Sequence, residues 1–251
     1  MYSGVYALPR IERVVFGRPA AEVVLDEARR ADARRVFILA PAVVVEKTDI
    51  VGAIVRALGE RHAGTWTDVS PHTPREDVIA AAAAAREAGA QLLVTVGGGS
   101  ITDAAKLVQT CLANDITRAE QLDEFRKRPD ESMTAERPGM RAPQVRTVAV
   151  PTTLAGAEFT PYAGITNMQR GVKEVFTHPL QVPRTIVLDP TASPACARRT
   201  GCGCPPASAR WTMRWRTSAP STPSPTRRAR RCRRSGCWRK RCPPRSATRR
   251  T

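Results

Sequence analysis

Three consecutive glycines separate a run of apolar residues from a segment of helical composition in the stretch LLVTVGGGSITDAAK. Gly97, Gly98 and Gly99 lack a Cβ, so their backbone can approach a ligand closely and adopt positive φ. Ser100 can cap the helix that follows, and Asp103 completes an S-x-x-D capping box. The N–H groups and positive dipole of a helix start attract an anion, and a pyrophosphate is the natural occupant. A tight strand-to-helix turn that binds nothing is the alternative, since the spacing is not G-x-G-x-x-G.

A second polar stretch, VPTTLAGAEFTPYAGITN, covers residues 150–167. Thr152 and Thr153 end an expected strand with two hydroxyl groups, which suits contact with a polar ligand. Glu158 and Tyr162 follow in the same stretch. Because both can be ordinary structural residues, neither is assigned a role in proton transfer.

The elements that must position these residues follow from hydrophobic patterning. Short β-branched runs alternate with alanine-rich segments of helical length, a pattern typical of βα units that feed a parallel sheet. The sequence therefore predicts the α/β class. We expect strands at 13–17, 34–40, 65–69, 91–96, 146–150 and 184–190, helices at 20–31, 46–60 and 74–89, and a hairpin near 161–176.

One expected helix has explicit boundary signals. In TPREDVIAAAAAAREAG, Thr73 is the expected N-cap, Pro74 takes the first helical position and Glu76 completes a capping box. The helix is expected to end at Gly89. Residues 114–143 are polar and interrupted by prolines, so we expect a long surface excursion there.

Charge divides the chain into two parts. Lys and Arg total 40 against 23 Asp and Glu, a formal net charge of +17. All of this excess lies in residues 191–251, which contain no acidic residue and no Leu, Ile, Val, Phe or Tyr. Residues 1–190 have balanced charge and abundant aliphatic side chains, enough for one domain with a sizeable core. We therefore predict an α/β domain over 1–190 and a disordered tail over 191–251.

Together the motifs resemble a known family. GGGSITDAAK, followed by PTT, AGAEFTPYAGIT and VPRTIVLDP, is similar to the iron-containing (group III) alcohol dehydrogenase family, and most to its maleylacetate reductase branch. The resemblance covers residues 8–190. It implies a Rossmann-like, dinucleotide-binding N-terminal domain of the dehydroquinate synthase-like fold and an all-helical C-terminal domain. It also implies an active site in the cleft between them and a homodimer for the intact member.

The resemblance assigns roles to individual residues. It implies that the pyrophosphate is held by Gly97, Gly98, Gly99 and Ser100, and that the cofactor is contacted further along by Thr152, Thr153 and Lys173. Asp103 and Lys106 match the family pattern GGGSxxDxAK, which places Asp103 among the cofactor-site residues. Two alternatives stay open: Lys173 can be a solvated hairpin lysine, and Asp103 can be only a helix cap.

The implied reaction is the reduction of maleylacetate to 3-oxoadipate by NADH or NADPH, in the catabolism of aromatic compounds. The stretch FILAPAVVV, at the second expected strand, has no carboxylate to bind the ribose hydroxyls and repel a 2′-phosphate, so NADPH is not excluded. No catalytic residue is assigned. A metal-dependent alcohol dehydrogenase of the same family is the alternative enzyme.

The composition of the tail predicts a change of reading frame between about Pro190 and Thr200. If the last base of each codon from Thr200 is joined to the first two of the next, permitted codons give WLWLPTGIRALDHAVEDICS. This peptide resembles the first helix of the family's C-terminal domain. Metal-dependent members have an Asp where it has Arg, so we expect no metal. The chain as written is then expected to bind dinucleotide weakly and to turn over nothing.

Two other functions compete for the tail. The arginines of RRARRCRRSGCWRKRC, residues 227–242, could bind nucleic acid through its phosphates. A zinc site would need converging thiolates, but the tail cysteines lack C-x2-C spacing. We favour frame-shifted sequence over both. The scattered histidines His62, His72 and His178 have no metal-ligand spacing and are expected at the surface or in loops.

The sequence carries no sign of export or membrane insertion. Its first residues have no long apolar run after a basic start, and no segment reaches the roughly 20 apolar residues of a membrane span. Cys111 is the lone cysteine of residues 1–190, which favours a reducing compartment. We therefore expect a cytoplasmic enzyme that acts on a small molecule.

Overall fold

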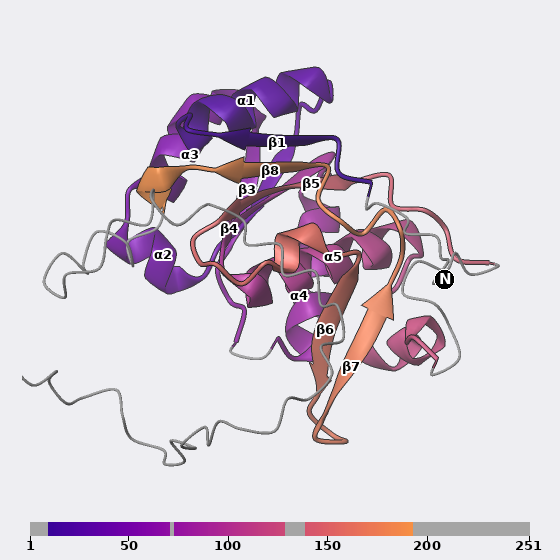
Figure 1. Cartoon of the computed structure of the whole chain (residues 1–251). Helices are drawn as coiled ribbons and strands as arrows, with labels where there is room; N and C mark the ends of the chain where they lie inside the picture. Colours follow the sequence, from indigo (N-terminus) through magenta and orange to yellow (C-terminus); the bar gives the residue numbers. More distant parts are fainter. Residues whose placement is uncertain (1–9, 71–72, 129–138, 193–251) are drawn as a thin grey trace, which may run out of the picture. The chain divides into compact units, whose positions relative to one another are not determined.

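The computed structural model describes residues 10–70, 73–128 and 139–192 of the chain (Figure 1). They include a six-stranded sheet in the order β1-β8-β5-β4-β2-β3, in which every neighbouring pair is parallel. Its strands are β1 Arg13–Phe16, β2 Val36–Leu39, β3 His62–Trp66, β4 Leu92–Gly97, β5 Arg146–Pro151 and β8 Thr185–Leu188. A separate antiparallel hairpin joins β6 Tyr162–Asn167 to β7 Val172–Thr177. The predicted α/β class with a Rossmann-like parallel sheet is confirmed, and so is the hairpin.

Helices connect the strands and cover both faces of the sheet (Figure 1). The α-helices are α1 Ala20–Arg30, α2 Ala42–Lys47, α3 Ile50–Leu58, α4 Arg75–Glu87 and α5 Gly99–Ala113. Short 3-10 helices are η1 Gly59–Arg61, η2 Ala119–Phe125, η3 Ala157–Phe159 and η4 Pro190–Ala192. Buried side chains of α1 and α3 belong to one hydrophobic cluster, while those of α4 and α5 belong to another.

Alternate side chains of the central strands supply these two clusters. Val36 and Ile38 of β2 lie in the cluster with α1 and α3, whereas Phe37 and Leu39 lie in the cluster with α4 and α5. Successive side chains of a strand point to opposite faces, and a sheet covered on both faces needs apolar residues at nearly every position. The run VFIL meets this need, and all four of its residues are buried.

Two elements differ most from those expected. The helix predicted over 46–60 is two helices, because Thr48 takes an extended conformation (φ −141°, ψ 151°) and ends α2. The strand predicted at 65–69 lies earlier, at His62–Trp66, and His62 pairs with Val36 of β2. Since β3 is an edge strand with one neighbour, its pairing with β2 sets its start more strongly than its own apolar pattern does.

The predicted capping box at the start of α4 is wrong. α4 begins at Arg75, Pro74 is its N-cap, and no side chain caps the helix. Thr73 has a φ of 53°, which is an unusual conformation for a β-branched residue. Its hydroxyl donates to the carbonyl of Ser100 (3.2 Å), and its carbonyl accepts the N–H of Thr166 (3.0 Å). Contacts between elements therefore outweigh the local capping signal.

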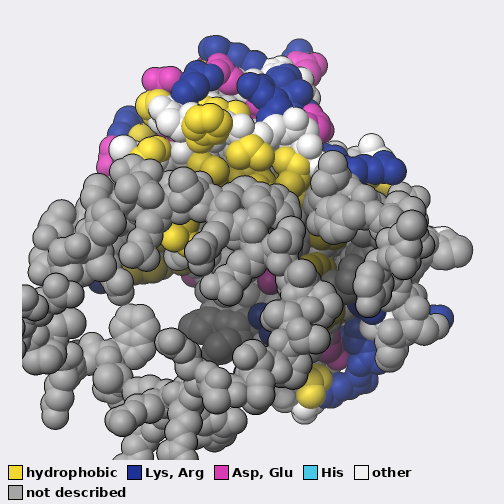
Figure 2. Space-filling model, viewed as in Figure 1, with side chains coloured by type: hydrophobic (Ala, Val, Ile, Leu, Met, Phe, Trp, Pro, Cys, Tyr) yellow, Lys and Arg dark blue, Asp and Glu magenta, His cyan; other side chains and the backbone are white. Residues whose placement is uncertain are grey.

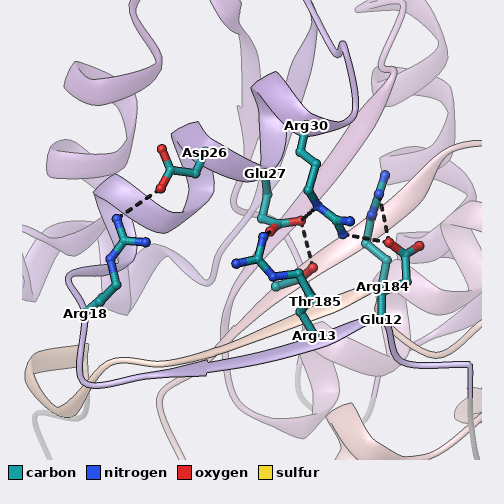
Figure 3. Close-up of polar contacts among 8 residues, drawn as sticks. All are labelled: Glu12, Arg13, Arg18, Asp26, Glu27, Arg30, Arg184 and Thr185. Atoms are coloured by element: carbon teal, nitrogen blue, oxygen red, sulfur yellow. Dashed lines mark hydrogen bonds and ion pairs between the residues drawn. The ribbon is translucent and has the colours of Figure 1, made fainter.

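A network of ion pairs ties α1 to β1 and β8 at the amino-terminal edge of the sheet (Figure 3). Glu27 of α1 is fully buried and accepts hydrogen bonds from Arg13 (2.7 Å), Arg30 (3.1 Å) and Thr185 (2.8 Å). Glu12 in turn accepts a hydrogen bond from Arg30 (2.6 Å). A buried carboxylate is costly unless it is paired, so these contacts fix the packing of α1 on the sheet.

The edge strand β1 exposes apolar side chains. Figure 2 shows charged side chains of both signs over α1 and a band of hydrophobic side chains below them, where Figure 1 draws β1. On this strand Val14 is 43% exposed and Phe16 is 77% exposed. Apolar side chains on an unpaired edge favour association with another surface. Within the described part of the chain, β1 pairs only with β8, so its other side has no neighbouring strand.

Some predictions concern residues outside the described ranges. They are the tail beyond Ala192 with its arginines and cysteines, His72, and residues 129–138 of the predicted excursion. The described part of that excursion contains η2. The predicted domain boundary after residue 190 stays a prediction.

Candidate functional site

The two polar motifs meet at the carboxyl-terminal edge of the sheet. β4 and β5 are neighbours, with Gly97 opposite Pro151 in their register. One residue further along, the N–H of Thr152 donates to the carbonyl of Gly97 (2.9 Å). Thr152 is buried, whereas Thr153 is exposed. The parallel sheet thus places the glycines and the threonines side by side.

The glycine turn is closely packed rather than conformationally unusual. None of Gly97, Gly98 and Gly99 has positive φ, so that part of the sequence-based prediction is wrong. Instead, a Cβ on Gly98 would lie 3.1 Å from Oγ1 of Thr153, and a Cβ on Gly99 would lie 3.3 Å from the Cβ of Ala155. Both separations are tighter than most contacts that real Cβ atoms make. The absence of side chains therefore lets the turn after β4 and the loop after β5 approach each other.

Helix α5 begins directly at this turn. Gly98 is the N-cap, Gly99 is the first helical residue, and no side chain caps the helix. Ser100 lies inside the helix and is exposed, so the predicted S-x-x-D capping box of Ser100 and Asp103 is wrong. The first N–H groups of a helix have no partner within it, and the positive end of the helix dipole lies at the same place. An anion suits this position.

The glycine turn lies where the connections of the sheet change direction. The chain passes from β2 to β3 through α3 on one face, and from β4 to β5 through α5 on the other. In open parallel sheets, ligands bind outside the carboxyl ends of the strands at such a point. Pro41, just after β2, closes one side, because a Cβ on Gly97 would lie 3.2 Å from its Cδ. Residues 40–45, which follow β2, contain no carboxylate.

Lys106 of α5 binds the loop that follows β5. It is fully buried, and its Nζ donates to the carbonyls of Ala157 and Tyr162 (both 2.7 Å). The same ammonium contacts Oγ1 of Thr160 and Oδ1 of Asp103 (both 3.2 Å). Burial lowers the pKa of Lys106 from its usual range, and the attraction of Asp103 opposes this effect. Three of its four oxygen contacts belong to one short segment, residues 157–162.

Asp103 has a role that neither sequence alternative describes. Its Oδ2 accepts the N–H of Gly164 in β6 (3.1 Å), while its Oδ1 contacts Lys106. Asp103 therefore joins α5 to the hairpin and does not cap the helix. Its contact with a cofactor stays a prediction.

Glu158 is buried in η3, next to Ala157. Burial raises the pKa of its carboxyl, while a backbone hydrogen bond and the charge of Lys106 act in the opposite direction. The carboxyl therefore holds its proton more tightly than an exposed glutamate does. Neither Glu158 nor Tyr162 is assigned a role in proton transfer.

Replacing Glu158 with glutamine is expected to remove one pH dependence of stability. Because its pKa is raised from 4.5 in the folded chain, the folded state binds this proton more tightly than the unfolded state does. That contribution is fully present below the unfolded pKa and is lost as the pH rises through the folded pKa. Urea unfolding from pH 4.5 upward should show the wild type losing stability relative to the Glu158→Gln variant. Parallel pH curves would contradict this prediction.

Lys173 lies on β7, and none of its described contacts is with the glycine turn. It is exposed, and its side chain covers Gly164, where a Cβ would lie 2.5 Å from Cε of Lys173. Gly164 in turn binds Asp103 of α5. The link from Lys173 to the first turns of α5 is therefore indirect, and both sequence alternatives for this lysine stay open.

A buried ion pair anchors the hairpin to the rest of the domain. Arg75, at the start of α4, donates to Glu174 of β7 (2.8 Å from its Nε) and to Asp123 of η2 (2.7 Å). Arg75 and Glu174 are only 4% and 5% exposed. Arg126 and Arg170, whose side chains are about half exposed, approach Glu174 at 3.3 and 3.7 Å. This cluster holds β7 against α4 and η2.

The described residues do not themselves bring together a metal centre, since no three His, Cys, Asp or Glu side chains converge within them. His62 begins β3, with Nε2 2.9 Å from Oγ1 of Thr65. His178 follows β7 and is buried; its Nδ1 accepts the N–H of Leu180 (3.0 Å). Burial also raises the pKa of the Cys111 thiol to about 12, which makes that thiol unreactive.

The fold and the glycine turn define an α/β protein with a Rossmann-like parallel sheet, and comparison with known proteins identifies its family. The sequence model of the family named Iron-containing alcohol dehydrogenase matches residues 11–190. The chain belongs to this family. Because the family is named for iron, the sequence-based expectation of no metal has no support from the comparison.

Several dehydrogenases and reductases are similar to this chain. Dehydrogenase FUM7 of Gibberella moniliformis (strain M3125 / FGSC 7600) is 32% identical over 190 residues, which are 72% of this chain and 43% of that protein. Maleylacetate reductase 2 of Cupriavidus pinatubonensis (strain JMP 134 / LMG 1197) is 34% identical over 178 residues, 71% of this chain and 40% of that protein. The crystal structure of sulfoacetaldehyde reductase from Bifidobacterium kashiwanohense in complex with NAD+ has a TM-score of 0.65 at 21% identity, and covers 77% of this chain and 48% of that one. The chain spans less than half the length of the curated relatives it matches.

Two features of the site were missed by the sequence analysis. The contacts of Lys106 with the loop after β5 involve residues more than 50 positions away, and only its i,i+3 spacing from Asp103 was visible in the sequence. The approach of Pro41 to Gly97 depends on the pairing of β2 with β4, which no local pattern encodes. Separately, none of the described helices is both long and apolar enough to span a membrane.

Proposed function

We propose that the described domain binds NADH or NADPH, with the pyrophosphate at the turn formed by Gly97, Gly98 and Gly99. The observation that carries this proposal is the meeting of two motifs at the switch point of the sheet, where a Cβ on Gly98 or Gly99 would come within 3.1 or 3.3 Å of the loop after β5. A pyrophosphate, which carries two negative charges, suits a turn without side chains at a helix start.

Different residues around the turn would contact different parts of the cofactor. The N–H groups at the start of α5, together with exposed Ser100, donate hydrogen bonds to phosphate oxygens. Thr153, exposed beside Gly98, and Thr152 contact the cofactor further along, and Lys173 approaches it from the hairpin. The missing carboxylate after β2 leaves room for a 2′-phosphate, so either nicotinamide cofactor is accepted.

We further propose that the complete enzyme reduces maleylacetate to 3-oxoadipate in aromatic catabolism. When bound, the nicotinamide would supply a hydride and solvent would supply the proton that completes the reduction, while the protein would orient the cofactor against the substrate. The similarity to maleylacetate reductase 2, at 34% identity, supports this choice. The name of the matching family, Iron-containing alcohol dehydrogenase, supports the alternative of a metal-dependent alcohol dehydrogenase. No step through a metal is derived, since the described residues supply no set of ligands for one.

A titration of the 251-residue chain tests the cofactor site. NADH and ADP-ribose are expected to bind weakly but saturably in isothermal titration calorimetry, because both carry the pyrophosphate. Adenosine, which lacks it, should give no measurable heat. Equal binding of adenosine and ADP-ribose would place recognition on the base rather than at the glycine turn. Oxidation of NADH with maleylacetate should be absent, and measurable turnover would overturn the expectation of an incomplete active site.

Resequencing the coding DNA tests the proposal for the complete enzyme. We expect a missing or extra base between the codons for about Pro190 and Thr200, with a family-like frame that continues downstream. The intact product would then be the reductase, and the basic tail an artefact of translation in the wrong frame. A confirmed sequence without such a frame would contradict this proposal. Nucleic-acid binding by residues 191–251, which carry no acidic residue, would then become the function to test.

A further inference from the structure

A fully buried ammonium needs compensation for its lost hydration. Lys106 is 0% exposed, and an unpaired charge in such a place would cost several kcal/mol. Its Nζ has oxygen contacts at 2.7 Å with Ala157 and Tyr162, and at 3.2 Å with Thr160. These contacts all lie on the segment 157–162, which follows the loop that carries Thr152 and Thr153. Lys106 therefore links this segment to α5.

The segment that Lys106 fastens also forms one wall of the glycine turn. A Cβ on Gly99 would lie 3.5 Å from the Cβ of Ala157, whose carbonyl accepts a hydrogen bond from Lys106. Ala155, two residues earlier, comes within 3.3 Å of the same position. Ala155 and Ala157 therefore both lie beside the first residue of α5. The same short loop therefore contacts the ammonium of Lys106 through the carbonyl of Ala157 and lies beside Gly99 through the side chains of Ala155 and Ala157.

Asp103 holds the far end of the same loop. It accepts the N–H of Gly164 (3.1 Å) and contacts Lys106 (3.2 Å). Two polar side chains of α5, Asp103 and Lys106, therefore bind the chain between Ala157 and Gly164. Stability alone does not require a charge here, because an apolar side chain of similar volume often serves as well as a buried ion pair. What an apolar side chain cannot do is fix two carbonyl groups at defined positions.

We propose that Lys106 is a positioning residue for the cofactor: its ammonium sets the distance between the loop after β5 and the glycine turn. The effect of Lys106 on cofactor affinity rests on the proposed function of the site, whereas its effect on the loop does not. Removing the ammonium therefore frees the loop and the turn, and weakens the binding of any dinucleotide that lies between them.

The test compares Lys106→Met with Glu27→Gln in the full 251-residue chain. Glu27 is also fully buried, but its partners Arg13, Arg30 and Thr185 lie at the amino-terminal edge of the sheet (Figure 3). Hydrogen exchange is measured for each chain without ligand, and NADH affinity is measured by calorimetry. Thr160→Val, which removes one oxygen contact of the ammonium, serves as a milder variant if Lys106→Met does not fold.

In Lys106→Met, amide exchange is expected to accelerate at least tenfold in the segments 98–102 and 152–160, with little change in β2 and α1. Glu27→Gln should instead accelerate exchange around α1 and β8. NADH affinity should fall at least tenfold in Lys106→Met and stay within twofold of wild type in Glu27→Gln. Unchanged exchange in both segments of the lysine variant, or equal acceleration in the two variants, would overturn the proposal.

The two proposals fail in different ways. If the wild type binds no NADH while exchange still accelerates selectively in Lys106→Met, the ammonium does position the loop and the proposed cofactor site is wrong. If NADH binds equally to the wild type and to Lys106→Met, the link between Lys106 and cofactor affinity is overturned whatever the exchange shows.

Discussion

Replacing Arg75 with methionine is expected to lower the free energy of unfolding by about 3–5 kcal/mol, the range typical for breaking a buried ion pair from one side. Arg75 is 4% exposed and pairs with Glu174, which is 5% exposed. Without the guanidinium, the carboxylate of Glu174 stays buried beside two partly exposed arginines, which compensate for only part of its lost hydration. Urea denaturation followed by circular dichroism measures the loss.

A double variant separates the buried charge from the packing of the side chain. Arg75→Met with Glu174→Leu removes both charges, so we expect it to recover most of the lost stability. Arg56→Met gives a matched control, because Arg56 pairs with Asp49 in solvent, where the two side chains are 66% and 75% exposed. That control should leave the urea midpoint unchanged. A small effect of Arg75→Met, similar to that of Arg56→Met, would show that the ion pair does not anchor the hairpin.

The long range of this ion pair explains which parts of the fold the sequence could predict. The strand VFIL, the glycine turn and the hairpin were predicted because their signals lie within a few neighbouring residues. Arg75 and Glu174 are 99 positions apart, and no local pattern pairs them. The carboxylate of Asp189 likewise accepts the N–H of Ala20 at the start of α1 (2.8 Å), 169 positions away. Such contacts arise only once the sheet order is set.

The two predicted capping boxes failed for related reasons. Both followed from correct local rules, and both helices do begin within two residues of the predicted cap. At α4, however, the hydroxyl of Thr73 binds the carbonyl of Ser100, 27 positions away, and not its own helix. At α5, Asp103 binds the hairpin at Gly164. Polar side chains near helix starts can serve tertiary contacts instead of caps, and this choice depends on what the fold brings within reach.

Gly98→Val is expected to reduce the affinity for NADH and ADP-ribose by more than about tenfold, or about 1.4 kcal/mol of binding free energy. The backbone of Gly98 (φ −89°, ψ −168°) is extended and accessible to any residue, so no backbone strain opposes the change. The obstacle is space, since the new Cβ would lie 3.1 Å from Oγ1 of Thr153 and 3.4 Å from its Cγ2. Thr153 is exposed and can move outward, so stability should change by less than about 1 kcal/mol. Calorimetric titration and urea unfolding of the same preparation check the two halves of this prediction.

A second substitution distinguishes two reasons why Gly98→Val would weaken binding: displacement of the loop after β5, or occupation of the phosphate position. In Gly98→Val with Thr153→Ala, the side chain nearest the new Cβ is shortened, so the loop can return to its place. Recovery of ADP-ribose binding in this double variant would mean that the valine acts by displacing the loop after β5. Persistent loss, with affinity well below that of Thr153→Ala alone, would mean that the valine occupies the position of the phosphates. Wild-type affinity in a folded Gly98→Val chain would exclude the glycine turn as the cofactor site, because no pyrophosphate bound against Gly98 could tolerate a branched side chain there.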